Sequence, residues 1–210
     1  MAVHQISPEL LTLERVDEIL KKGLKLELSA ESKSRILKCR EYLDNKMQTQ
    51  KEPIYGVTTG FGSLCNISIS KEQLSQLQKN LVMSHACGVG EEVPQEIVKI
   101  MLLNKIQSLS YGNSGVQLQT VERLIAFFNN DIFPVVYQQG SLGASGDLAP
   151  LAHMCLPLLG LGVVDYKGER ISGEELNKRF SWQPIELQSK EGLALLNGTQ
   201  FMSSFEIGRA

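Results

Sequence analysis

The chain has 210 residues, of which 42% are hydrophobic and 21% are charged, an ordinary balance for a globular protein. Its net charge of −2, with no more than two consecutive basic residues anywhere, provides no electrostatic footprint for nucleic acid or for an anionic membrane. We therefore expect neither among its partners.

The amino-terminal segment, MAVHQISPELLTLERV, has no basic region followed by an apolar core, so we expect no secretory signal and a cytoplasmic location. The four cysteines are widely spaced without a C-x-x-C pair, which favours reduced thiols over disulfides. The three histidines are too scattered to indicate zinc, and we expect no metal.

Apolar residues repeat at helical spacing along most of the chain. The expected helices lie in chain order at about 7–23, 29–47, 70–85, 94–109, 117–130, 147–161, a short stretch from Ser172, and 189–210. The fourth is apolar over more than half its circumference and should be deeply buried. Pro157 should kink or end the sixth. The segment 163–171 is the one convincing hairpin, turning near Lys167 and Gly168. Residues 1–210 are therefore predicted to form an all-α domain with one minor β-hairpin.

The stretch from Gly140 to Pro150, GSLGASGDLAP, places three glycines within seven positions, directly before an apolar helical run. Glycine lets this backbone turn tightly and be approached closely, and the positive end of a helix beginning near Asp147 would lie beside it. The stretch lacks the G-x-S-x-G of a nucleophile elbow, the lysine of a phosphate-binding loop and the spacing of a dinucleotide fingerprint. Taken alone, it also fits a tight loop that packs onto a helix.

Continued to GSLGASGDLAPLAHM, this stretch resembles the sequence typical of the histidine and phenylalanine ammonia-lyases. Three further blocks resemble the same family in the same order: YGVTTGFG at 55–62, SHACGVG at 84–90 and EGLALLNGTQ at 191–200. Four matches spread over most of the chain make a chance likeness implausible. The resemblance implies a fumarase/aspartase-like helical domain whose loops carry the active site.

The resemblance also implies a built-in cofactor, 4-methylideneimidazol-5-one (MIO), made from Ala144, Ser145 and Gly146. In the family, the glycine nitrogen attacks the alanine carbonyl, and the loss of two waters leaves a methylidene where the serine hydroxyl was. The residue types suit this chemistry, because Gly146 offers an unhindered nitrogen and the neighbouring glycines permit a strained turn. The product is an electrophile that needs no external cofactor.

Two more residues receive roles from the resemblance. Tyr55 matches the tyrosine assigned as the base for the β-proton, which requires a phenol pKa about two or three units below its usual value of about 10. Asn197 matches a residue close to MIO and to the polar end of the substrate, and Gln200 is a weaker candidate. On local sequence alone, Tyr55 also fits a Gly-rich turn and Asn197 also fits a turn cap before Gly198.

The pair Ser84-His85 bears on the substrate. Family members that act on phenylalanine or tyrosine carry Phe-Leu or His-Leu here, whereas histidine ammonia-lyases carry Ser-His. An imidazole at His85 can exchange a hydrogen bond with the imidazole of L-histidine. The resemblance thus implies elimination of ammonia from L-histidine to give trans-urocanate; the alternatives are a phenylalanine or tyrosine ammonia-lyase, or an MIO aminomutase. His153 is expected to be structural.

Family members are more than twice as long as this chain and form homotetramers, whose sites also use a later tyrosine, arginine and glutamate. We therefore expect the chain to be an N-terminal portion of such an enzyme. A hypothesis of another class is a non-catalytic helical domain, inactive without the remaining chain, in which MIO is not formed.

Overall fold

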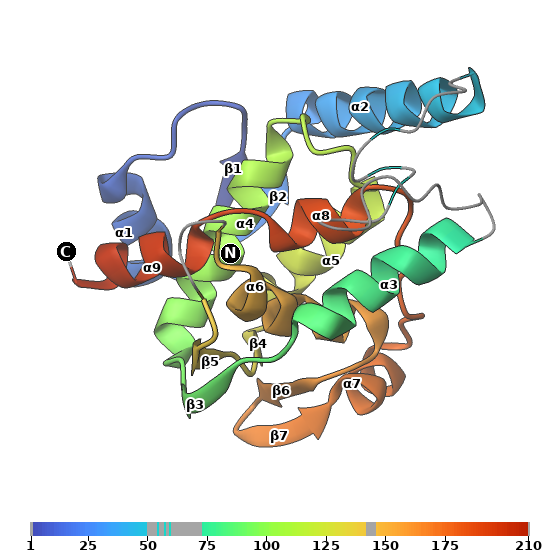
Figure 1. Ribbon diagram of the computed structural model, residues 1–210. Helices are drawn as coiled ribbons and strands as arrows, with labels where there is room; N and C mark the ends of the chain where they lie inside the picture. The colour runs from blue at the N-terminus through green and yellow to red at the C-terminus, as the bar shows by residue number, and fades with distance from the viewer. Residues whose placement is uncertain are drawn as a thin grey trace.

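The computed structural model describes residues 2–49, 54, 57, 59, 73–141 and 146–209. Most of the described residues are helical (Figure 1). The elements in chain order are β1 (Val3–Ile6), α1 (Leu13–Lys21), β2 (Lys25–Leu28), α2 (Ala30–Thr49), α3 (Leu74–His85), β3 (Val89–Glu92), α4 (Gln95–Ser110), α5 (Leu118–Asn129), β4 (Ile132–Pro134), β5 (Tyr137–Gln139), α6 (Leu148–Cys155), the 3₁₀ helix η3 (Leu156–Leu159), β6 (Val163–Tyr166), β7 (Glu169–Ser172), α7 (Gly173–Phe180), α8 (Glu191–Leu196) and α9 (Gln200–Arg209).

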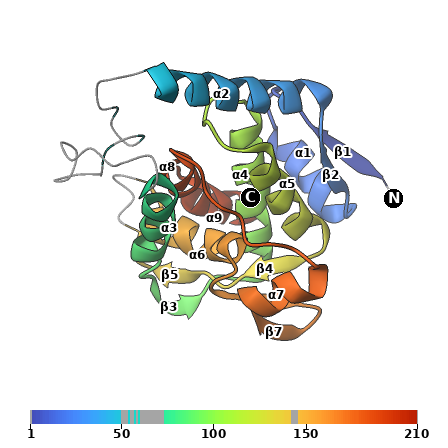
Figure 2. The same cartoon turned by 90° about the vertical axis from the view of Figure 1, so that its right-hand side faces the viewer.

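Helix α4 forms the centre of the core. It packs against α5 and α9, and nearly all of its apolar side chains are buried, as the apolar pattern of this segment predicts. In the turned view, α2 crosses the top of the molecule, α3 lies on one side, and α1 lies on the other with β1 and β2 (Figure 2). One shared apolar interior therefore holds α4 and the surrounding helices together.

The all-α prediction needs correction, because the described residues include three small sheets. β1 pairs in parallel with β2, and β3 pairs antiparallel with β5. The predicted hairpin is confirmed as β6 and β7, with Lys167 and Gly168 at positive φ in the turn, and β4 adds a third strand to it. Strands of three or four residues are too short to show a two-residue periodicity.

Three helix boundaries differ from or refine the prediction. The first helix begins at Leu13, where the Thr12 hydroxyl accepts from the amide of Arg15, and does not begin at Ser7. α6 ends just before Pro157, as predicted, and continues as η3. The expected helix over 189–210 is broken into α8 and α9. Residues 70–72 of the predicted capping box lie outside the described residues, but α3 ends at His85 as predicted.

A buried carboxylate fixes the beginning of α8. Glu191 is fully buried, and its two carboxylate oxygens accept from the amide and side chain of Gln117, the hydroxyl of Thr120 and the amide of Gln188. These donors come from the start of α5 and from the turn before α8, where helix-terminal amides lack partners within their own helix. Glu191 therefore joins the two helix starts and sets where α8 points.

We expect Glu191→Gln to lower the free energy of unfolding by about 2–4 kcal/mol, because an amide cannot accept four hydrogen bonds and would present its own N–H groups to donors. Urea denaturation followed by circular dichroism measures the change. The exposed Glu206→Gln is the control and should leave the midpoint unchanged. Equal midpoints for the two variants would contradict the assignment.

Candidate active site

The predicted site residues that the structure describes lie where three helices end or begin. His85 is the last residue of α3, Gly146 and Asp147 directly precede α6, and Asn197 directly follows α8. α3, α6 and α8 pack against one another and lie side by side in Figure 1. Segments far apart in the sequence thus meet at one place.

Gly146 occupies a position that only glycine suits. Its φ is +102°, and a Cβ atom there would lie 2.9 Å from the carbonyl oxygen of Gly198 and 3.4 Å from the side-chain oxygen of Asn197. The backbone of the glycine-rich loop therefore approaches the turn after α8 without an intervening side chain. Of the three residues in this contact, Gly146 and Asn197 are both predicted site residues.

Asp147 fastens this loop on two sides. Its side chain is fully buried, and the two carboxylate oxygens accept from the hydroxyl of Ser141 (2.8 Å) and from the amide of Met202 (3.0 Å). Its own amide donates to the carbonyl of Gly198 (2.8 Å). The side chain makes no capping bond to α6, although the residue stands at the N-cap position. Asp147 therefore orients the loop against α9.

Asp147→Asn should lower the free energy of unfolding by about 1–3 kcal/mol, since an amide can accept at only one of the two positions and one donor loses its partner. Chemical denaturation of both proteins provides the measurement. Asp17→Asn, at an exposed carboxylate of α1, is the matched control. An Asp147 variant as stable as this control would show that the two contacts contribute nothing.

His85 is held by its own helix. Its Nδ1 atom lies 2.8 Å from the carbonyl oxygen of Leu81 and 3.3 Å from the hydroxyl of Ser84. A carbonyl only accepts, so Nδ1 carries the proton and donates to it. In the neutral ring Nε2 is then the acceptor, and the described residues provide no hydrogen bond to it.

The turn between α8 and α9 carries Asn197, whose side chain is exposed. Gly198 follows at φ +148°, and the side chain of Gln200 lies across it, 2.2 Å from where a Cβ would be. The side-chain oxygen of Gln200 is buried without a hydrogen-bond partner among the described residues. Behind the turn, the buried ammonium of Lys105 contacts the carbonyl of Asn197. Sequence reasoning missed this residue because nothing in its helical segment indicates a buried partner for a lysine.

His153 links α6 to the segment that follows His85. Its Nε2 accepts from the amide of Gly88 (3.0 Å), and its ring meets the ring of Tyr137 edge-on. Burial lowers the pKa of His153 below the usual imidazole value, because the charged ring is poorly solvated there. The neutral ring is also the form that can accept from Gly88. The contacts agree with the structural role expected for His153.

Wild-type stability should therefore fall as the pH drops below about 6.5, the ordinary imidazole pKa. In that range the unfolded chain binds a proton at His153 more readily than the folded chain does, because the pKa of the folded form is lower. We expect the stability difference between wild type and His153→Gln to shrink between pH 7 and 5. Urea titrations of both proteins at each pH measure it, and the other titrating groups cancel in the difference. A pH-independent difference would contradict the assignment.

Tyr55, Ala144 and Ser145 lie outside the described residues, so the structure places only part of the predicted set. A groove of about 950 Å³ lies between the start of α3, α5 and residues 183–188, and none of the predicted site residues lines it. Within the described residues no helix is long and apolar enough to cross a membrane, and no cluster of metal-binding side chains is found.

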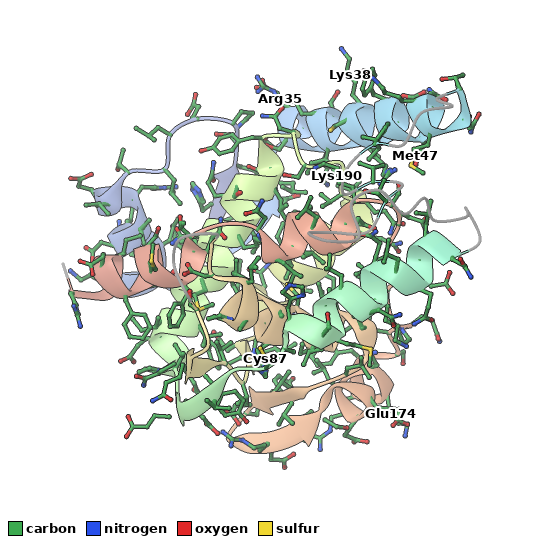
Figure 3. All side chains as sticks on the ribbon, viewed as in Figure 1. Arg35, Lys38, Met47, Cys87, Glu174 and Lys190 are labelled. Carbon is green, nitrogen blue, oxygen red and sulfur yellow. The ribbon has the colours of Figure 1, made fainter. Side chains whose placement is uncertain are left out.

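Three cysteines are free thiols: Cys39, Cys87 and Cys155. Cys87 is exposed and lies just after α3 (Figure 3). Lys190, also labelled there, lies between α8 and α2, and its ammonium donates to the carbonyl oxygen of Ser114. Cys65 lies outside the described residues.

Comparison with known protein families identifies the class of protein to which this helical domain belongs. The chain belongs to the aromatic amino acid lyase family, which matches residues 11–207. A curated relative, the histidine ammonia-lyase of Symbiobacterium thermophilum, is 49% identical over 194 residues; the match covers 92% of this chain and 38% of the relative.

Solved structures show the same fold. Histidine ammonia-lyase from Trypanosoma cruzi superposes with a TM-score of 0.86 at 33% identity, covering 99% of this chain and 40% of that one. Tyrosine aminomutase from Streptomyces globisporus gives 0.88 at 33% identity, covering 99% and 38%. The chain thus spans well under half the length of the relatives that it matches.

Proposed function

We propose that this chain carries the electrophile-forming and imidazole-binding part of a histidine ammonia-lyase, which eliminates ammonia from L-histidine to give trans-urocanate. The observation that carries the proposal is the seating of Gly146, at positive φ, against Asn197 and Gly198. Curated relatives named histidine ammonia-lyase at 48–49% identity support this substrate over phenylalanine or tyrosine.

The surroundings of Gly146 fit MIO. A residue whose nitrogen must attack a carbonyl two positions earlier needs a sharply turned backbone without a side chain, and Gly146 has both. Asp147, anchored to Ser141 and Met202, holds the carboxyl side of the loop in place. Ala144 and Ser145 would complete the ring, and MIO would supply an electrophilic methylidene that activates the substrate amine.

His85 supports recognition of an imidazole. With Nδ1 donating to Leu81, the neutral ring presents Nε2 as an acceptor for the N–H of the substrate imidazole. A phenyl or phenol ring has no N–H to donate, so this arrangement favours histidine over the substrates of the alternative enzymes. Asn197 would bind the polar end of the substrate, and Tyr55 would remove the β-proton.

Because the chain spans 38% of the length of its curated relatives, we assign turnover to a protein of their full length. Such a protein would be a cytoplasmic homotetramer whose sites include residues from several subunits. The 210-residue chain alone would then have little or no activity, whether or not its loop cyclises.

The first test is the intact mass of the 210-residue chain. We expect the loss of two waters, mapped by peptide analysis to Ala144–Gly146, because Asp147 and Gly198, which hold the carboxyl end of the loop, belong to this chain. Ser145→Ala, which cannot form the methylidene, is the control for the mapping. An unmodified mass in both this chain and a full-length protein would overturn the MIO assignment.

The second test measures histidine deamination by the full-length protein through urocanate absorbance. His85→Leu should reduce kcat/KM for L-histidine roughly 5- to 150-fold, because the N–H of the substrate imidazole loses its acceptor, at a cost of about 1–3 kcal/mol. The same substitution should relatively favour phenylalanine. Unchanged kcat/KM would remove His85 from substrate binding.

A further inference from the structure

Lys105 is a fully buried lysine of α4 whose ammonium lies beside the end of α8. Its Nζ atom donates to the carbonyl oxygens of Ala194 (2.9 Å) and Asn197 (3.2 Å). No ion pair among the described residues includes it. The charge is therefore held by backbone carbonyls in the interior of the molecule.

Such a group destabilises the fold unless its hydrogen bonds compensate. Burial lowers the pKa of Lys105 to about 8, although the neighbouring Cys155 opposes the shift. A methionine of similar length would fill the same space without desolvating a charge. Packing alone does not explain an ammonium here.

The contacts of Lys105 are those of a helix cap. The last carbonyls of a helix have no partners within it, and a cation near them is favourable. α8 spans only six residues, Glu191–Leu196, so its end depends on outside contacts. Lys105 provides them from the rigid central helix α4.

The turn that follows α8 contacts Lys105 on one side and the candidate active site on the other. The carbonyl of Asn197 accepts from Lys105, and the next carbonyl, that of Gly198, accepts from the amide of Asp147 (2.8 Å). Gly146 packs directly on Gly198. Two consecutive carbonyls thus connect α4 on one side to the glycine-rich loop on the other.

We propose that Lys105 is a positioning residue of the active site: its ammonium fixes the Asn197–Gly198 turn and, through that turn, the placement of Gly146 for cyclisation. The inference rests on the proposed function for its chemical consequence, but the positioning itself concerns only contacts within this chain. Lys105 does not touch the reacting atoms.

Gln107 offers a matched control on the same helix. It is also buried in α4, and its side-chain nitrogen donates to two backbone carbonyls, those of Ser7 (2.9 Å) and Glu9 (3.2 Å). These belong to the amino-terminal segment and have no part in the site. A purely structural role for a buried polar group of α4 would affect Lys105 and Gln107 variants alike.

The experiment compares wild type, Lys105→Met, Lys105→Arg and Gln107→Met by intact mass during refolding and by amide hydrogen exchange at Asp147. For Lys105→Met we expect dehydration about 10- to 100-fold slower, since misplacing reacting atoms by about 1 Å has such effects. The Asp147 amide should exchange about tenfold faster or more. Gln107→Met should change neither quantity, and Lys105→Arg, which keeps a cation and its donors, should restore both.

Wild-type values for dehydration and Asp147 exchange in folded Lys105→Met would overturn the proposal, as would equal losses in Lys105→Met and Gln107→Met. If wild type itself loses no water, the MIO assignment for this chain fails, and the Asp147 amide alone decides the role of Lys105. Should Lys105→Met not fold, Lys105→Gln, whose shorter side chain cannot reach both carbonyls, takes its place with the same outcomes.

Discussion

The arrangement of the candidate site depends on one short turn, Asn197 to Thr199, between two helices. Its backbone carbonyls accept hydrogen bonds from Lys105 on one side and from Asp147 on the other. A carbonyl has a fixed direction on a rigid peptide plane, so two neighbouring carbonyls with different partners restrict the turn strongly. Gly146 and Asp147, at the carboxyl end of the glycine-rich loop, are positioned by this turn.

Two buried carboxylates extend the same principle. Glu191 fixes the start of α8 by accepting from α5 and from the turn before it, and Asp147 fixes the loop before α6 against the start of α9. Each satisfies amides that a helix end leaves without partners. The functional region is thus held mainly by polar groups at helix ends, whereas the apolar interior around α4 holds the helices themselves.

The helices could be predicted from the sequence because their apolar faces span many turns, as in the segment from Ile97 to Leu109. The parallel pairing of β1 with β2 could not, because strands of four residues carry little pattern and their pairing depends on the intervening α1. The predicted helix over 189–210 runs through the break at Asn197, whereas the alternative of a turn before Gly198 agrees with it.

The motifs indicated His85, Gly146 and Asn197, and the structure brings their helix ends together; Tyr55, Ala144 and Ser145 stay predictions. Lys105 was missed because α4 carries a second lysine, Lys99, and the sequence does not show which of the two is buried.

The seating of Gly146 on the turn after α8 has a consequence for the order of events in folding. These segments are distant in sequence, so they meet only after the chain has closed a long loop, a slow step in folding. Covalent ring closure at Ala144–Gly146, if it requires that contact, cannot precede it. A molecule that has lost the two waters would then be one in which the contact between Gly146 and the turn after α8 had formed at least once.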